Sequence, residues 1–431
     1  GEKTDGHLYL AKAVAASTPL VIIHDEAAAG PEIRSACGVL LVTDTVTALM
    51  KLAAAYRRQL DGTRVIAVGG SNGKTTTVRL IDAVLSTELK GTASKKSFNN
   101  NIGVPLTILG AKRGDQYLIC EVGTNAPGEI APLTDAVRPD IAVLTSIGRE
   151  HLEGLGSIEG VIREELSLLA GLKPGGLAVL PVDVPDLRAA LRRSGPMLAT
   201  TKTLWFGTGS EADLRVSNVR TSIEGTTFTL NERESITVSL PGVHNATNAA
   251  AAVAVARRLG ISDGAIVAGL AGAKGPPMRM ERSEVGGVTF INDAYNANPD
   301  SMLRSLDTFF AIAAEAGALR AVLVLGDMLE LGGQAAALHR EVLRAAHGHV
   351  VRSPVPVQTV LVGSLMAEAA TELSDAPVMR LAKTDGQGAS AAAEMLNPGD
   401  CVLLKGSRGT AVDRVLEAFR ERIGRTEPAA T

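Results

Sequence analysis

Apolar runs alternate with helical stretches in the first sixty residues. The predicted elements are helices at 7–15 and 44–57 and strands at 20–23 and 39–42. Asp44 marks the start of the second helix because its side chain favours the N-cap position, and Asp61-Gly62 indicates a turn after it. These elements predict an α/β unit over residues 1–61. Since Gly1 leads directly into such sequence, we expect the front of this unit to be missing.

Strands that are apolar throughout appear after Thr63 and predict a parallel sheet covered on both faces. They occupy residues 65–68, 118–122 and 141–147. A helix predicted at 75–89 has apolar residues at helical spacing on one face. Residues 203–240 contain short segments separated by turn residues, so we expect an antiparallel insertion beside the sheet. The pattern predicts a central domain over residues 62–273.

A second α/β pattern follows the segment Gly275-Pro276-Pro277, which we interpret as a linker. The strands predicted beyond it are residues 288–292, 321–325, 359–362 and 401–404. Their alternation with helices predicts a doubly wound, Rossmann-like sheet of about six strands over residues 274–431. Residues 426–431 are expected to form a frayed tail. The sequence therefore predicts an α/β protein of three domains.

Charge and cysteine usage narrow the classes of function. The chain has 43 Lys and Arg residues against 46 Asp and Glu residues, which leaves no overall basic field to hold nucleic acid. No run approaches the ~18 apolar residues that a membrane span needs, and the N-terminus lacks a signal-peptide pattern. Cys37, Cys120 and Cys401 lie far apart, which fits a reducing compartment. We expect a cytoplasmic monomer without a nucleic-acid partner.

A glycine-rich segment lies between the strand at 65–68 and the helix at 75–89. It reads Gly70-Ser71-Asn72-Gly73-Lys74-Thr75-Thr76. Such a turn points its N–H groups at phosphate oxygens, and the helix dipole adds to the attraction. Here Lys74 is expected against the terminal phosphates of ATP, and the Thr75 hydroxyl on Mg²⁺. The loop is shorter than the usual Walker A spacing, and the alternative interpretation is an ordinary glycine turn.

Two further polar residues follow strands of the same predicted sheet. Glu121 ends the strand at 118–122, and His151 follows the strand at 141–147. Ligands of open parallel sheets bind beyond the carboxyl ends of the strands. A carboxylate and an imidazole there are suited to hold metal ions beside the phosphates. The alternatives are a salt-bridge partner for Glu121 and a structural role for His151.

Several independent motifs support one family resemblance. They are Asn99-Asn100-Asn101-Ile102-Gly103, Glu121-Val122-Gly123-Thr124-Asn125, His151-Leu152-Glu153-Gly154, Gly242-Val243-His244-Asn245, Asp293-Ala294-Tyr295-Asn296-Ala297-Asn298-Pro299, Gly326-Asp327-Met328-Leu329-Glu330-Leu331-Gly332 and Lys405-Gly406-Ser407-Arg408-Gly409. In this order they resemble the Mur ligases, which build the peptide of bacterial peptidoglycan precursors. The asparagine run and the segments at 295–299 and 326–332 are typical of the member that adds D-alanyl-D-alanine to UDP-N-acetylmuramoyl-tripeptide.

The resemblance implies a role for each matching residue. Lys74 and Thr75 match groups that hold ATP and Mg²⁺, and Glu121 and His151 match metal ligands. The residues matching the nucleotide site are Asn245, Asn248, Arg279 and Asp293, and those near the muramoyl or C-terminal substrate are Asn100, Thr124, Asn298, Lys405, Ser407 and Arg408. Capping or turn formation is the alternative role for the asparagines.

One position departs from the family pattern. Where the family usually has a carbamylated lysine that helps to bind a second metal ion, this chain has Glu165. Its carboxylate keeps the required charge without CO₂, although the side chain is shorter. We expect Glu165 to replace the modified lysine. The alternative is a surface residue beside a weakened metal site.

The resemblance implies an ATP-dependent ligase that forms an amide through an acyl phosphate. The accepted substrates are then UDP-N-acetylmuramoyl-tripeptide and D-alanyl-D-alanine, and the process is peptidoglycan synthesis. Other readings remain: another Mur-type or folylpolyglutamate-type ligase, or a non-catalytic homologue that binds UDP-precursors or nucleotides. A P-loop kinase or transport ATPase requires acceptor or partner motifs that this sequence does not show.

Overall fold

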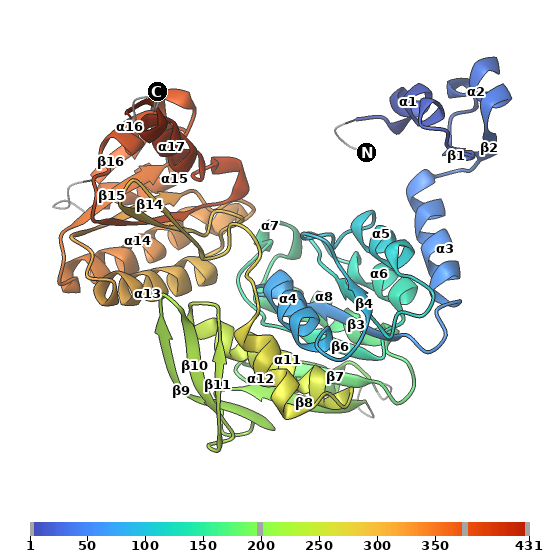
Figure 1. Ribbon diagram of the computed structural model, residues 1–431, viewed down its shortest axis with the longest axis horizontal. Helices are drawn as coiled ribbons and strands as arrows, with labels where there is room; N and C mark the ends of the chain where they lie inside the picture. Colours follow the sequence, from blue (N-terminus) through green and yellow to red (C-terminus); the bar gives the residue numbers. More distant parts are fainter. Residues whose placement is uncertain (1–3, 196–200, 373–377, 427–431) are drawn as a thin grey trace, which may run out of the picture.

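The computed structural model describes residues 4–195, 201–372 and 378–426. The first unit contains a short parallel pair, β1 (Leu20–Ile23) and β2 (Gly38–Leu41), with helices α1 (Leu10–Ala15) and α2 (Pro31–Ala36) beside it. Helix α3 (Thr45–Arg57) then leads to the central part of the molecule (Figure 1). The predicted cap is confirmed, because the Asp44 side chain accepts a hydrogen bond from Thr47 N.

The central part is built on one large sheet. Within the described residues it has nine strands in the order β11-β10-β9-β8-β7-β6-β3-β5-β4. Their bounds are β3 (Arg64–Gly69), β4 (Gly91–Ala93), β5 (Tyr117–Glu121), β6 (Ile141–Leu144), β7 (Leu177–Pro181), β8 (Lys202–Gly207), β9 (Leu214–Ser222), β10 (Gly225–Leu230) and β11 (Glu234–Val238). Strands β4 to β8 pair in parallel, as the continuous apolar runs predicted.

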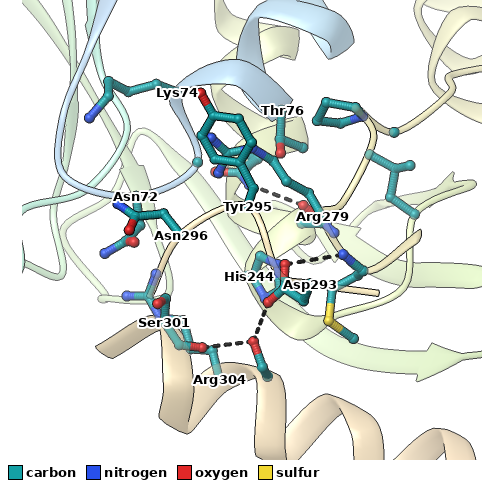
Figure 2. A pocket seen from close by; sticks show the side chains of 18 of the residues that line it. Asn72, Lys74, Thr76, His244, Arg279, Asp293, Tyr295, Asn296, Ser301 and Arg304 are labelled. Carbon is teal, nitrogen blue, oxygen red and sulfur yellow. Dashed lines mark hydrogen bonds between the residues drawn. The ribbon is translucent and has the colours of Figure 1, made fainter. Parts of the chain in front are cut away.

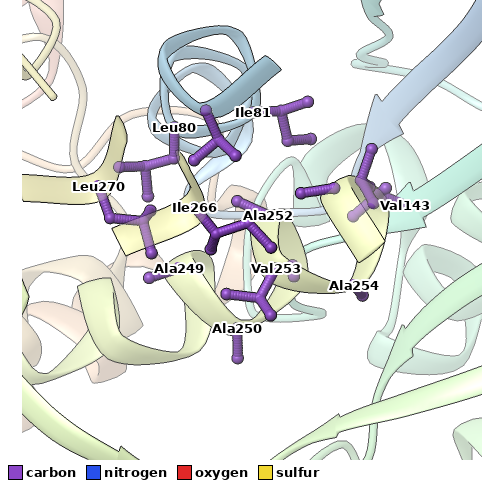
Figure 3. Close-up of a cluster of buried hydrophobic side chains, with 14 of the residues drawn as sticks. Leu80, Ile81, Val143, Ala249, Ala250, Ala252, Val253, Ala254, Ile266 and Leu270 are labelled. Atoms are coloured by element: carbon purple, nitrogen blue, oxygen red, sulfur yellow. The ribbon is translucent and has the colours of Figure 1, made fainter. Parts of the chain in front are cut away.

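Helices cover both faces of this sheet, and their packing explains its burial. They are α4 (Lys74–Leu85), α5 (Gly103–Gly110), α6 (Ile130–Val137), α7 (Leu152–Leu155), α8 (Ile158–Leu166), α9 (Leu187–Arg193), α11 (Val243–Arg258) and α12 (Asp263–Ala271). On one face, the alanine-rich α11 packs against α4 and α12 (Figure 3). Small alanine side chains let the helices approach closely, and Leu80, Ile81 and Val253 fill the space between them.

Three sequence-based boundaries were wrong. The insertion expected to be antiparallel begins with β8, which pairs in parallel with β7; only β9 to β11 are antiparallel. The intervening helix α9 returns the chain to the same end of the sheet, and a parallel pair results. Strand β6 ends at Leu144 because Thr145 and Ser146 turn away to bond the glycine-rich loop. Helix α4 ends at Leu85 rather than at residue 89.

The C-terminal part contains a second doubly wound sheet. The described strands follow the order β12-β13-β17-β14-β15-β16, in which only the edge strand β12 is antiparallel. The strand bounds are β12 (Glu281–Val285), β13 (Val288–Asn292), β14 (Arg320–Gly326), β15 (Val357–Val362), β16 (Val378–Leu381) and β17 (Asp400–Lys405). The helices are α13 (Pro299–Glu315), α14 (Ala335–Arg352), α15 (Ser364–Ala369), α16 (Gly386–Glu394) and α17 (Arg414–Thr426).

The prediction of a six-stranded Rossmann-like sheet is confirmed for the described residues. The expected tail at 426–431 lies outside them, apart from Thr426. No helix in the described part of the chain has the length and apolar character required to traverse a bilayer.

Candidate active site

The glycine-rich loop connects β3 to α4, and two glycines are required by its geometry. Gly70 and Gly73 have φ values of 113° and 87°, which side chains disfavour. A Cβ atom on Gly73 would lie 2.6 Å from Asn248 Oδ1, and one on Gly70 would lie 2.5 Å from Thr145 Oγ1. The loop is therefore built for close approach of its backbone to other groups, as a phosphate cradle requires.

Lys74 lies at the start of α4 among acceptors. Its Nζ donates to Gly70 O (2.6 Å) and Ser71 O (3.3 Å) and lies 3.6 Å from Glu150 Oε1. Burial lowers the pKa of the Lys74 ammonium, but nearby carboxylates, Glu150 foremost, outweigh it, and the pKa is raised overall. Lys74 is thus a fixed cation beside the loop.

Glu150 is a candidate site residue that the sequence analysis missed. It is buried, and it lies between Lys74 and His151, whose Nε2 is 4.0 Å from Glu150 Oε2. Burial raises the pKa of Glu150 to about 7, and the Lys74 charge opposes that rise. The only sequence signal was its place directly before His151, beyond the carboxyl end of β6.

Thr75 and Glu121 lie together with two polar neighbours. Thr75 Oγ1 is 3.0 Å from Ser97 Oγ, and Glu121 Oε1 accepts a hydrogen bond from Asn99 Nδ2 (3.0 Å). Burial raises the pKa of Glu121. Its other carboxylate oxygen is buried without a hydrogen-bond partner within the described residues. An orphaned buried oxygen needs an explanation, and a Mg²⁺ ion that also binds phosphates and water fits this oxygen-rich set.

His151 and Glu165 have different surroundings. His151 Nδ1 faces Glu330 Oε2 at 2.5 Å, and burial lowers the pKa of its imidazole. Glu165 is fully buried behind the loop, where Oε2 accepts a hydrogen bond from Gly70 N (2.7 Å). Burial raises the pKa of Glu165 to about 7. The alternative of a surface-exposed Glu165 does not hold, because its carboxylate is buried and accepts a hydrogen bond from the loop backbone.

Acidic and histidine side chains near the loop do not form a close cluster among the described residues. No three His, Cys, Asp or Glu side chains in the described ranges gather closely enough to hold a metal ion. Glu165 retains one buried oxygen, Oε1, that has no partner among the described groups.

A cavity of about 500 Å³ lies between the central and C-terminal sheets, with the loop on its wall. The loop residues that line it are Ser71, Asn72, Gly73, Lys74 and Thr76. From the opposite wall, the Arg279 guanidinium lies 4.3 Å from the Tyr295 ring centroid (Figure 2). It also donates to Thr75 Oγ1 at 3.3 Å. Asp293 Oδ2 lies 2.9 Å from Lys405 Nζ on the same wall. The cavity falls within the usual size of small-molecule sites.

The predicted adenine-side residues also lie on this cavity. Asn248 Nδ2 donates to Asn245 Oδ1 (3.0 Å), and Asn245 Nδ2 donates to Pro241 O (2.8 Å). Both asparagines lie inside α11, so the capping alternative does not apply to them. Beside them, burial lowers the pKa of His244 to about 4, which leaves a neutral imidazole at pH 7.

Two residues predicted near the muramoyl substrate, Asn100 and Thr124, form local hydrogen bonds. Asn100 Oδ1 accepts hydrogen bonds from Ile102 N (3.2 Å) and Gly103 N (2.9 Å) at the start of α5. Thr124 Oγ1 donates to Ala126 O at 2.7 Å. Neither lines the 500 Å³ cavity, although their chain neighbours Asn99 and Asn125 do.

A second cavity of about 100 Å³ adjoins the first. Its lining residues are Glu150, His151, Asn296, Ala297, Asn298, Leu329, Glu330, Leu331, Ser407, Arg408 and Gly409. Ser407 Oγ accepts a hydrogen bond from Leu329 N (2.9 Å), and Arg408 pairs with Asp413 (2.9 Å). Lys405, expected with these residues, lines the larger cavity instead. The small cavity thus brings residues of both sheets around His151.

Comparison with known proteins agrees with this arrangement. The description "Mur ligase middle domain" matches residues 68–256, and "Mur ligase, glutamate ligase domain" matches residues 278–408. The UDP-N-acetylmuramoyl-tripeptide--D-alanyl-D-alanine ligase of Bacillus subtilis (strain 168) is 37% identical, over 98% of this chain and 89% of the relative. The enzyme of that name from Mycobacterium tuberculosis (strain ATCC 25618 / H37Rv) is 33% identical, over 97% and 88%.

Solved structures give the same result. A crystal structure of MurF from Acinetobacter baumannii is 28% identical with a TM-score of 0.83, covering 98% of this chain and 89% of that one. The MurF ligase from Thermotoga maritima in complex with ADP is 26% identical with a TM-score of 0.81, covering 99% and 94%. From these matches, which extend over nearly the whole sequence, the chain belongs to the Mur ligase family.

Proposed function

We propose that this chain is an ATP-dependent ligase that adds D-alanyl-D-alanine to UDP-N-acetylmuramoyl-tripeptide in peptidoglycan precursor synthesis. The near end-to-end likeness to relatives of that name supports the choice of substrates. The observation that carries the proposal is the loop at 70–76, which lies on the wall of a cavity between two sheets. A smaller cavity adjoins it at His151, where a second substrate has room to meet the first.

The larger cavity is proposed to hold ATP, with its phosphates at the loop. Lys74 supplies positive charge at the terminal phosphates, and Arg279 approaches from the C-terminal domain. Thr75 and Glu121 would hold Mg²⁺, which would neutralise phosphate charge there. Asn245 and Asn248 lie where the base is proposed, and Asp293 holds Lys405 on the opposite wall.

The reaction follows from the weakness of a carboxylate as an acyl donor. An oxygen of the tripeptide carboxylate attacks the γ-phosphorus of ATP, so that ADP leaves and an acyl phosphate forms. The amine of D-alanyl-D-alanine then attacks the acyl carbon and expels phosphate, giving the amide. The amine must lose a proton, and His151 and Glu150 line both cavities in position to accept it. Positioning and charge neutralisation supply most of the catalysis.

The same proposal covers the domains and the setting of the enzyme. We assign the UDP-substrate domain to residues 1–61, the ATP domain to 62–273 and the amine-substrate domain to 274–431. The three cysteines are free thiols, which fits the reducing cytoplasm that we propose as the setting of the enzyme, and we propose that it acts as a monomer. Within the second domain, Glu165 is proposed to supply the negative charge of the family's modified lysine from behind the loop.

A phosphate-release assay tests the proposal. The purified chain receives MgATP and UDP-N-acetylmuramoyl-tripeptide, with and without D-alanyl-D-alanine. We expect phosphate release that requires both substrates. Glutamate, D-glutamate and diamino acids serve as alternative amines, and turnover with one of these instead would assign a different ligase activity. ATP binding without any turnover would favour a non-catalytic homologue.

A further inference from the structure

An ion pair joins the two sheets beside the small cavity. His151 begins α7 in the central part, and Glu330 follows β14 in the C-terminal part. His151 Nδ1 lies 2.5 Å from Glu330 Oε2, although 179 positions separate the two residues. Both residues line the cavity at which the second substrate is proposed to bind.

Both partners have backbone conformations that side chains disfavour. The φ value of His151 is 49° and that of Glu330 is 63°, in the left-handed region. Non-glycine residues persist there only where the surrounding structure fixes them, and such residues cluster at functional sites. Two such residues are in direct contact across a domain boundary. This contact indicates that the surrounding structure fixes the pair for a functional role.

The surrounding contacts fix the segment that carries Glu330. Its carbonyl oxygen accepts a hydrogen bond from Glu153 N (3.2 Å), within α7. Leu152 and Leu155 of α7 are buried in the same apolar cluster as Leu331. Helix α7 therefore packs against the C-terminal core across the domain boundary, and a change of the Glu330 side chain leaves these backbone and apolar contacts intact.

The geometry also fixes how the imidazole presents its nitrogens. A carboxylate only accepts hydrogen bonds, so the ring nitrogen facing Glu330 carries the proton. In a neutral ring this places the lone pair on Nε2, which faces Glu150 Oε2 at 4.0 Å.

We infer that Glu330 is a positioning residue that acts through His151: it sets the orientation and tautomer of the ring, and it does so only when the two domains are docked. The inference rests on the proposed function for its place in the reaction. It assigns a role to the segment at 326–332. It also makes the orientation and tautomer of the His151 ring depend on docking of the amine-substrate domain. If the ion pair lacked this role, its removal would change neither the tautomer of the His151 ring nor the turnover.

Nitrogen NMR of the histidine rings tests the structural half without any turnover. The full chain has seven histidines, and a His151→Asn variant assigns the signals of that ring. The wild-type ring is expected to carry its proton on Nδ1. Glu330→Gln, which keeps an acceptor oxygen, should retain this tautomer, whereas Glu330→Ala should shift the ring towards the Nε2-protonated form. An unchanged spectrum in Glu330→Ala overturns the inference.

Kinetics test the functional half. Loss of the hydrogen-bond partner of a metal-ligating histidine typically costs about 10- to 100-fold in metal affinity or activity. We expect kcat of Glu330→Ala to fall by about that factor, with the KM for ATP nearly unchanged and with partial recovery in Glu330→Gln. Glu394→Gln, at an exposed glutamate of the same domain, is the matched control and should behave as wild type. Wild-type kcat in Glu330→Ala overturns the inference. A wild-type chain without turnover contradicts the proposed function instead, and the NMR result still decides the role of Glu330.

Discussion

The side-chain amides of Asn72 and Asn298 exchange two hydrogen bonds between the phosphate loop and the C-terminal domain. Asn298 Nδ2 donates to Asn72 Oδ1 (2.9 Å), and Asn72 Nδ2 donates to Asn298 Oδ1 (3.4 Å). Asn298 Oδ1 also accepts from Ser301 N and so caps α13. One residue therefore links the start of a helix to the loop proposed to hold ATP.

Substitution of Asn298 separates these two roles. Asn298→Asp keeps the cap but places a carboxylate against Asn72 Oδ1, so we expect near-normal stability and a raised KM for ATP. Asn298→Ala loses both contacts, and the lost cap alone costs about 1 kcal/mol. Urea unfolding and ATP kinetics on both variants measure the difference. An equal KM for ATP in Asn298→Asp and wild type would show that the amide pair does not contribute to ATP binding.

Arg149 of the central part forms ion pairs with two residues of the C-terminal part. It donates to Asp300 Oδ1 (2.8 Å) and to Glu341 Oε2 (2.8 Å), and these partners raise the pKa of its guanidinium. We expect Arg149→Ala to favour an open arrangement, seen as a larger radius of gyration by small-angle X-ray scattering with MgATP bound. Arg149→Lys should recover little, because a lysine does not reproduce the forked geometry. Arg258→Ala, at an exposed position on α11, should leave the scattering unchanged.

The close approach of α11 to the loop makes Gly73 sensitive to a single methyl group. Gly73→Ala adds a Cβ 2.6 Å from Asn248 Oδ1 at a φ of 87°. We expect a loss of about 1–3 kcal/mol in the free energy of unfolding and weaker ATP binding by calorimetry. Gly110→Ala is the control, since nothing lies within 4 Å of the added atom. If Gly73→Ala matched that control in both measurements, the tight loop geometry would be wrong.

Burial of His244 gives stability a specific pH dependence. Burial lowers the pKa of its imidazole from the ordinary value of about 6.5 to about 4. Between these two pKa values the unfolded chain binds a proton at His244 and the folded chain does not. The free energy of unfolding therefore falls as pH drops from about 6.5 to 4. The slope approaches 1.4 kcal/mol per pH unit for one proton. His244→Gln should flatten this part of the curve in urea unfolding at several pH values, and an unaltered slope would contradict the assignment.

The sequence predicted those features that depend on residues close together along the chain. The cap at Asp44, the glycine turn at 70–73 and the alternation of strands and helices each have a short-range physical cause, and the fold class followed from them. The edge position of β12 and the parallel pairing of β8 depend instead on how distant elements meet, which local patterns do not encode.

The same distinction applies to the candidate site. Lys74, Thr75 and Glu121 were found because strand ends and a glycine turn place them together. Glu150 and Glu330 were missed because their significance lies in contacts across the fold: Glu330 meets His151 from another domain. Glu165 was recognised from its motif, but its burial behind Gly70 N required the packed structure.

The transfer of a labelled oxygen tests the central claim most directly. UDP-N-acetylmuramoyl-tripeptide carrying ¹⁸O at both oxygens of its terminal carboxylate is incubated with the chain, MgATP and D-alanyl-D-alanine, and the released phosphate is examined by mass spectrometry. Passage through an acyl phosphate predicts one ¹⁸O atom in each phosphate released. Phosphate released in step with amide formation but free of the label would contradict phosphoryl transfer to the carboxylate.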